Sequence, residues 1–422
     1  MAWWPFKAYR LRKLPGTIWI HCPRTEDLPS IKLFSSRLLP NRVIPALGLL
    51  ALVLVWILDF GTIQPNRIVP GTGHGLLSAV GWWGAAVVSL VLVVTVLLSI
   101  MPLRIRFILL LGVVALSLAM LPALLDVFAT RHLPEGSPYA RSSVGPGFWS
   151  LLFFLSLMLI EILGRLRTRR GIQLLLLLLI AGSWLTLLMS DGLESLSLVR
   201  EFNARPDKFA QALWTHLALA FGAVAISACL AFALALKMIR SAAWQRPILG
   251  IVSFLQTIPS LAVFGLLIAP LSALSAAFPL LQEMGIRGIG WAPAMLALIA
   301  YSLLPMVRNT FVALSEVPES LVDAGRGMGM TERQLFFQVK LPLALPVIIE
   351  GVRITTIQAI GLTAVAALIG AGGFGGFIFQ GLGQAAMDLV LLGALPTIAL
   401  ALVADALFSM LATALKPTPA TA

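Results

Sequence analysis

Charged residues are scarce in this chain of 422 residues, at 11% of the total, whereas average soluble domains carry about 25%. Hydrophobic residues make up 59% of the sequence. Several apolar runs exceed the ~18 residues needed to cross a hydrocarbon core about 30 Å thick. The composition therefore excludes an ordinary soluble domain and predicts a polytopic membrane protein.

Cysteines and the common motifs of soluble enzymes are also scarce. Of the two cysteines, Cys22 precedes the apolar runs and Cys229 lies within one, so neither a disulfide framework nor a metal site is indicated. No Gly-Lys-Ser or Gly-Lys-Thr triplet occurs, which excludes the usual phosphate-binding loop of ATPases. The net charge of +12 could suggest nucleic acid, but the basic residues cluster in short segments between apolar runs, as in membrane proteins.

Ten apolar stretches are candidate membrane spans. Lipid offers no hydrogen-bond partners to the backbone, so each of these stretches should be a helix. The stretches lie at about 43–58, 77–100, 107–128, 147–163, 172–190, 209–236, 247–269, 291–312, 343–369 and 390–412. We therefore expect an all-α polytopic fold with about ten transmembrane helices.

Charge and proline divide the chain into regions. Residues 1–42 form a basic arm, 43–190 a first set of helices, 191–208 a polar linker and 209–415 a second set. If the N-terminus is cytoplasmic, Lys and Arg favour the inner segments over the outer ones by roughly three to one. This bias predicts that both termini are cytoplasmic, that the linker is extracytoplasmic and that the polar segment 316–342 faces the cytoplasm.

The segment 316–342 contains a helical face of small and apolar residues. Leu321, Ala324, Gly325 and Met328 follow the i, i+3, i+4, i+7 spacing of one helix face. Small residues on such a face let another backbone approach closely, and a charged rim suits docking into a groove on a soluble partner. The alternative is a helical linker packed on the membrane end of its own chain.

The same segment contains helix-ending and helix-starting signals. Gly327 and Gly329 can end the first helix with a left-handed C-cap. Thr331 with Gln334 matches a capping box that opens a second helix, which we expect to stop before Pro342. The sequence therefore predicts two short helices at a glycine elbow.

The pattern of this segment resembles the EAA loop of ATP-binding-cassette importer permeases. That pattern runs Glu-Ala-Ala, three residues, Gly, nine residues, a branched apolar residue, any residue, Leu-Pro. The matching residues are Asp323, Ala324, Gly325, Gly329, Val339, Leu341 and Pro342. Asp323 and Gly325 depart from the usual Glu and Ala. The resemblance implies that these residues, with Glu319, form a coupling helix seated in a cleft of a separate ATPase subunit.

Longer stretches resemble permeases for glycine betaine, choline, carnitine and related osmoprotectants. They are Leu213–Leu236, Ile248–Ile268, Pro293–Met330 and Leu368–Leu382, so the resemblance covers about residues 205–415. It implies a type I importer core in the last five helices, within a bacterial inner membrane. The first five spans resemble those of the long-form permeases of this group.

The resemblance also implies a set of partners. They are ATPase subunits that bind ATP and magnesium, a second permease copy or a paralogous permease, an extracytoplasmic substrate-binding protein and membrane lipid. No cofactor in this chain and no nucleic acid is expected.

A polar interruption near residue 257 provides candidates for the solute pathway. Proline frees a backbone carbonyl, and such breaks are tolerated where the backbone lines a cavity, although an ordinary proline kink is the alternative. Aromatic rings can also attract a quaternary ammonium. The candidates are Gln256, Thr257, Pro259, Ser260 and Tyr301, together with Asp405, a charged residue deep in the last span.

Three other features have simpler interpretations. Gly370–Gly375 matches a dinucleotide motif literally, but it follows a membrane helix, so we expect a turn where helices cross closely or the chain re-enters the membrane. Glu350 and Arg353 are spaced as a helical ion pair. His216 is expected to bond a neighbouring helix rather than a metal.

Other functions remain open at this stage. The solute could be another small compound such as an amino acid or a metal chelate. The chain could also be an ATP-independent carrier or channel, or a membrane-embedded enzyme, although the polar residues are scattered rather than clustered at one membrane depth.

Overall fold

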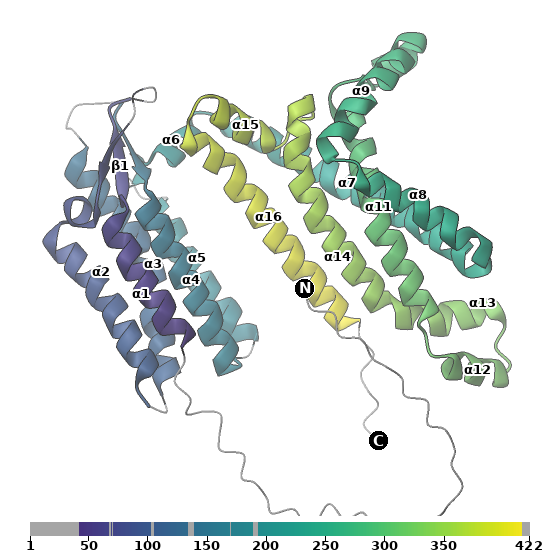
Figure 1. Ribbon diagram of the computed structural model, residues 1–422, viewed down its shortest axis with the longest axis horizontal. Coiled ribbons are helices and arrows are strands. Elements are labelled where there is room, and N and C mark those ends of the chain that lie inside the picture. The colour runs from purple at the N-terminus through teal and green to yellow at the C-terminus, as the bar shows by residue number, and fades with distance from the viewer. Residues whose placement is uncertain are drawn as a thin grey trace, which may run out of the picture.

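The computed structural model describes residues 42–66, 69, 71–102, 105–133, 139–168, 170–188 and 193–415. The predicted basic arm at 1–42 lies outside the described residues except for Arg42. The described chain forms two helical halves that lie side by side (Figure 1). We call the end that carries the strands and α15 the strand end, and the opposite end, which carries α12 and α13, the loop end.

The N-terminal half is a bundle of five helices with its own apolar core. Its helices are α1 (Val43–Ile57), α2 (Leu76–Ile100), α3 (Arg106–His132), α4 (Pro146–Leu166) and α5 (Arg170–Leu188). Buried side chains from Ile44 to Leu196 form one continuous cluster among them. The Trp184 indole donates to the carbonyl of Leu118 at 2.9 Å, which ties α5 to α3.

A small sheet closes the strand end of this half. It consists of β1 (Gly61–Gln64), β2 (Thr72–His74) and β3 (Arg141–Val144), antiparallel in the order β2-β1-β3. An entirely helical chain was expected from the apolar runs, so the sheet is an addition to that fold class. The strands are three or four residues long and lie in the connections between helices, where alternation is too short to recognise.

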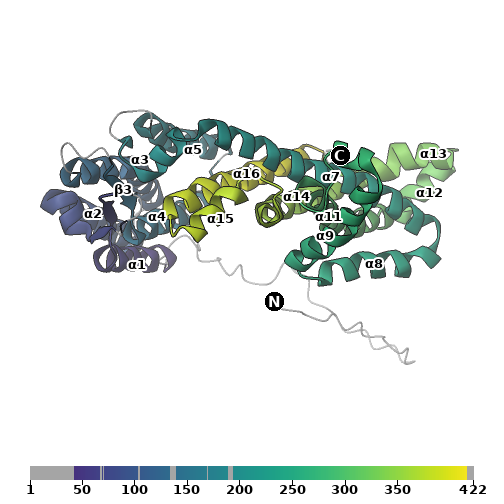
Figure 2. The same cartoon turned by 90° about the horizontal axis from the view of Figure 1, so that it is seen from above.

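The C-terminal half packs four long helices along one another (Figures 1 and 2). These are α7 (Pro206–Arg240), α11 (Trp291–Ser315), α14 (Leu341–Ala366) and α16 (Met387–Ala414). The shorter elements around them are η2 (Ala242–Trp244), α8 (Gln245–Thr257), α9 (Ser260–Ala277), α10 (Pro279–Glu283), α12 (Glu319–Gly327), α13 (Glu332–Leu335), η3 (Phe336–Lys340), η4 (Ala367–Ile369) and α15 (Gly375–Gly383).

The described parts of all ten predicted spans are largely helical, but the described residues contain eight helices long and apolar enough to cross a membrane, fewer than the ten or so expected. Helix α1 and the apolar part of α5 are shorter. The predicted span at 247–269 is wrong as one helix, because the chain breaks at Ile258 and Pro259 into α8 and α9. Pro259 has no N–H to donate to a preceding helical turn, which favours a break at this position.

The second helix of the loop does not stop before Pro342 as expected. It runs from Glu332 through η3 and α14 to Ile369 as one continuous helical segment. The N–H of Leu341 bonds to the carbonyl of Phe336, five residues back, so η3 is a π-helical turn. This wider turn accommodates the proline, which neither donates a hydrogen bond nor fits against a regular α-helical turn.

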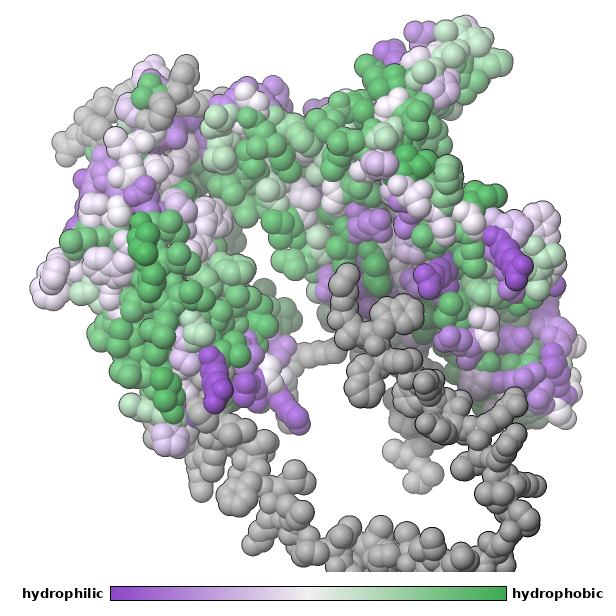
Figure 3. Space-filling model, in the orientation of Figure 1, coloured by the Kyte–Doolittle hydropathy of each residue, from purple (hydrophilic) through white to green (hydrophobic). Residues whose placement is uncertain are grey.

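The two halves meet at α6 (Ser197–Asn203), which precedes α7 at the strand end. Leu198 of α6 packs against both the N-terminal core and a C-terminal cluster that contains Phe374 and Leu389. Figure 3 shows the halves separated by a hollow toward the loop end. The helix α6 is therefore the joint between two separately packed bundles.

The glycine-rich turn between η4 and α15 allows close helix crossing, as expected. Gly370, Gly372 and Gly373 have positive φ angles of 77°, 82° and 77°. A Cβ on Gly375 would lie 1.8 Å from the backbone oxygen of Ala364, so only glycine lets α15 approach α14 this closely. The turn is thus part of the helix packing.

Gly375→Ala should destabilise the folded chain by about 1–3 kcal/mol, because the added methyl meets backbone that cannot move aside. The matched control is Gly376→Ala, whose Cβ would meet nothing within 4 Å. That change should be neutral or stabilising by up to about 1 kcal/mol. Thermal unfolding of both variants in detergent checks this, and equal midpoints would contradict the crossing geometry.

Candidate functional site

The loop end carries a compact hairpin of two short helices, α12 and α13. The N–H of Met330 bonds to the carbonyl of Gly325 at 3.1 Å, and that of Gly329 bonds to Arg326 at 2.9 Å. Gly329 has φ of 82°. These two bonds with a left-handed glycine constitute a Schellman motif, which ends α12 sharply. The elbow predicted at this glycine is confirmed.

The predicted capping box at the start of α13 is also confirmed. The Thr331 hydroxyl accepts from the Gln334 N–H at 3.3 Å, and the Gln334 side-chain oxygen accepts from the Thr331 N–H at 2.9 Å. Two backbone donors at the helix start are thereby satisfied. The hairpin is therefore held by backbone geometry on both sides of its elbow.

One face of α12 packs inside the hairpin. Val322 and Gly325 are buried, and a Cβ on Gly325 would lie 2.9 Å from Cδ1 of the fully buried Leu335. Because Gly325 has no side chain, α13 of the same chain can pack closely against α12. The expectation that Gly325 lies on an open face with Ala324 is wrong, because Gly325 turns inward.

The opposite face of α12 remains open. Leu321 is 45% exposed and Met328 is 74% exposed, and Ala324 between them is exposed too. Charged side chains surround this stripe, and Figure 3 shows hydrophilic residues gathered over α12 and α13. An apolar stripe with a charged rim on a rigid hairpin is a surface that can dock into a groove.

Ion pairs orient the charged rim. Arg326 pairs with Glu332 at 3.0 Å and with Asp323 at 3.4 Å, so its guanidinium bridges α12 and α13. The hydrogen bond to Glu332, with the charges of both carboxylates, raises the pKa of Arg326 above its ordinary value. All three side chains are at least half exposed, so these pairs fix orientation more than they add stability.

The remaining loop candidates lie at the two ends of the hairpin. Glu319 stands in the first turn of α12, where its charge complements the helix dipole. Leu341 packs with Ala313 and Ala344 at the loop end of α11 and α14. Pro342 occupies the first turn of α14, directly after the π turn.

Two of the pathway candidates, Gln256 and Tyr301, connect the α8–α9 break to α11. The Gln256 amide donates to the carbonyl of Tyr301 at 2.7 Å, and the Tyr301 hydroxyl donates to the carbonyl of Ile258. The Thr257 hydroxyl donates to Phe254 at 2.7 Å. Tyr301 is only 7% exposed. Polar side chains therefore satisfy the backbone groups near the break.

The neighbouring candidates Pro259 and Ser260 cap and begin α9. Asp405 lies apart from this group. Its carboxylate pairs with Arg353 at 2.6 Å, and Arg353 also pairs with Glu350 at 2.7 Å. The predicted helical ion pair is confirmed, and Asp405 extends it across to α16.

His216 also bonds neighbouring elements, as predicted. Its Nδ1 accepts from the N–H of Phe374 at 3.3 Å, which leaves Nε2 to donate to the carbonyl of Ile360 at 3.0 Å. The ring is fully buried. This histidine therefore ties α7 to α14 and to the glycine-rich turn.

A buried polar cluster at the joint was missed from the sequence. Arg141 of β3 pairs with Glu201 of α6 at 2.8 Å and lies 3.6 Å from Asp388 of α16. The Ser197 hydroxyl donates to Asp388 at 2.5 Å, and Arg205 pairs with Glu201 at 3.3 Å. Glu201 and Asp388 are 3% and 9% exposed. Arg141, Glu201 and Asp388 are far apart in the chain, so their pairing leaves no local signal.

Eight helices long and apolar enough to span a membrane, with a two-helix hairpin at one end of the described chain, define its class, a polytopic membrane protein. Residues 212–417 match the family described as "Binding-protein-dependent transport system inner membrane component". Residues 41–199 match "ABC transporter permease YehY, N-terminal domain".

Two relatives each match slightly less than half of the chain. The carnitine transport permease protein OpuCB of Listeria monocytogenes is 39% identical over 192 residues, which cover 46% of this chain and 81% of that protein. The osmoprotectant import permease protein OsmW of Salmonella typhimurium is 41% identical over 202 residues, 48% of this chain and 89% of that protein. The chain belongs to the family of binding-protein-dependent ABC transport permeases.

A solved structure also resembles part of the chain. A chain of the MetNI methionine ABC transporter in an inward-facing conformation superimposes with a TM-score of 0.43 and 23% identity. The match covers 50% of this chain and 97% of that one.

Thr331→Ala should loosen the start of α13 by about 1 kcal/mol, because the Gln334 N–H loses its acceptor. Thr331→Ser keeps the acceptor and is the matched control. Hydrogen exchange at the Gln334 amide should rise about fivefold in the alanine variant only. Unchanged protection in the alanine variant would show that the cap does not hold the elbow.

Proposed function

We propose that this chain is the membrane-spanning subunit of an ATP-driven importer for an osmoprotectant such as glycine betaine or choline. The names of the relatives, which denote carnitine and osmoprotectant permeases, support the solute class. The charge bias of the loops supports an orientation with the loop end and both termini in the cytoplasm. The strand end then faces the substrate-binding protein.

The proposed coupling step rests on one observation, the open stripe of Leu321, Ala324 and Met328 on α12. The opposite face of α12 is packed inside the hairpin. An ATPase subunit docks this stripe in a surface groove. That subunit binds ATP and magnesium and performs the hydrolysis, because this chain has no phosphate-binding loop. Asp323 and Glu319 belong to the charged rim of the same surface.

The continuity of α13, η3 and α14 explains how movement of the hairpin reaches the membrane. A force applied to α12 passes through Gly325 and Leu335, which are in contact, into α13. Since α13 continues into α14, a displacement of the hairpin moves a transmembrane helix as a rigid lever. Closure of two ATPase subunits then drives alternating access as a rigid-body motion.

A second permease subunit completes the pathway. Helices α8 and α9 expose large apolar side chains, including Ile251, Phe254, Leu261 and Leu266. Only 22% of the apolar helix α9 is buried by the rest of the chain. Another copy, or a paralogous permease, covers part of this surface, and lipid covers the rest. The break at Pro259 then lies close to the shared pathway.

A different small solute, such as an amino acid, is the alternative within the same class. Competition by unlabelled glycine betaine in whole-cell uptake separates the two, because only an osmoprotectant importer is inhibited. An ATP-independent carrier is a further alternative, which accumulation without any ATPase subunit would support.

Ala324→Trp should weaken ATPase binding by about tenfold or more, because the indole overfills a groove shaped for a methyl group. Ala324→Ser is the matched control and should retain assembly. Copurification of the ATPase together with betaine uptake measures both effects. If the tryptophan variant shows normal uptake and normal assembly, the stripe on α12 does not dock the ATPase.

A further inference from the structure

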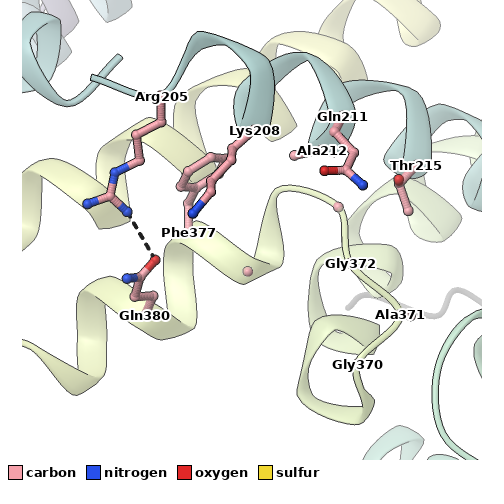
Figure 4. A pocket seen from close by; sticks show the side chains of 12 residues that line it. Arg205, Lys208, Gln211, Ala212, Thr215, Gly370, Ala371, Gly372, Phe377 and Gln380 are labelled. Atoms are coloured by element: carbon pink, nitrogen blue, oxygen red, sulfur yellow. Dashed lines mark hydrogen bonds between the residues drawn. The ribbon is translucent and has the colours of Figure 1, made fainter. Parts of the chain in front are cut away.

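A pocket of about 470 Å³ opens at the strand end of the C-terminal half (Figure 4). The first turns of α7 form one wall, and the glycine-rich turn with the start of α15 forms the other. Small-ligand sites have volumes of about 300–1,000 Å³. The pocket thus has room for a small solute, and it lies at the opposite end of the bundle from the hairpin.

The lining of this pocket is positively charged. Arg205 and Lys208 contribute two cations, Gln211 and Gln380 contribute amides, and none of the lining residues is Asp or Glu. These side chains project from both walls in Figure 4. Cationic and amide donors without a competing carboxylate favour an anionic group over a cationic one.

The two cations differ in how much of their charge is available. Arg205 pairs with Glu201 at 3.3 Å and donates to the Gln380 side-chain oxygen at 3.4 Å. Lys208 is exposed and forms no salt bridge with any residue that the structure describes. Lys208 is therefore the cation free to pair with an incoming anion, and Arg205 is held in the wall.

The glycine-rich turn adds backbone donors. Gly372 and Gly373 both line the pocket, and their N–H groups have no hydrogen-bond partner among the described residues. A Cβ on Gly372 would lie 3.2 Å from the Thr215 methyl group, so glycine lets this turn lie close against α7. Unpaired N–H groups on a turn with positive φ are suited to bind anions.

We propose that this pocket binds the carboxylate of a small zwitterionic solute, with Lys208 as its ionic partner and the Gly372 and Gly373 N–H groups as donors. The inference rests on the proposed importer function and narrows its solute class to betaines. Choline has no carboxylate and carries only a cation, which Arg205 and Lys208 repel. The permease itself thus contributes to selection between these solutes.

Equilibrium binding of radiolabelled glycine betaine to the purified full-length chain in nanodiscs tests the proposal. Lys208→Gln should weaken binding about tenfold or more, since a charge-assisted bond is lost. Lys208→Arg, which keeps the charge, should remain within a few-fold of the unaltered chain. The control Lys237→Gln removes a lysine at the loop end, which packs on Trp244, and should change nothing.

Unlabelled choline should fail to displace the labelled betaine. Equal affinity in Lys208→Gln and the unaltered chain, displacement by choline, or no binding at all would each overturn the proposal. A further outcome would also overturn it: Lys208→Gln captures the substrate-binding protein more weakly, while its solute binding is unchanged. An acidic side chain of that protein would then be the occupant of the pocket. A failure of the proposed importer function is a separate result: the assembled transporter would then show no ATP-driven uptake of any osmoprotectant.

Discussion

The pairing of backbone N–H and C=O groups within hydrocarbon is the constraint on which the whole structure depends. Lipid satisfies none of these groups, so the apolar stretches are helical, and side chains or altered turns supply partners at several interruptions. At the α8–α9 break, Tyr301 donates to the carbonyl of Ile258, and Gln256 binds the backbone of α11. Before Pro342, a π turn lets the helix continue. At the glycine-rich turn, His216 accepts from the N–H of Phe374.

The same constraint makes the hairpin continuous with a membrane helix. Because η3 keeps α13 and α14 in one helical segment, the loop is an extension of a membrane helix rather than a flexible connection. The Schellman motif at Gly329 and the capping box at Thr331 hold α12 at a defined angle to that helix. The open stripe on α12 is therefore presented by rigid geometry, which suits the force transmission proposed for it.

The joint between the halves combines apolar contact with buried charge. Leu198 packs against both cores, and Arg141, Glu201 and Asp388 pair from three different elements. Removing water from such charges is costly unless they are paired, so breaking one partner leaves the others unfavourably buried. Arg205, which pairs with Glu201 in the joint, also lines the pocket.

Local chemistry in the sequence by itself determined the helical class, most of the spans and the glycine elbow with its capping box, because apolar length, Gly329 and the Thr331–Gln334 spacing act within a few residues. The Glu350–Arg353 pair was predictable for the same reason. Tertiary structure alone decided that Gly325 faces inward onto Leu335. It also decided that Asp405 pairs with Arg353. The pairing of Arg141 with Glu201 and Asp388 has the same origin. Tertiary structure also brought Lys208 and the glycine-rich turn to one pocket. These contacts join residues distant in the chain, and only the packing of whole helices sets which faces meet.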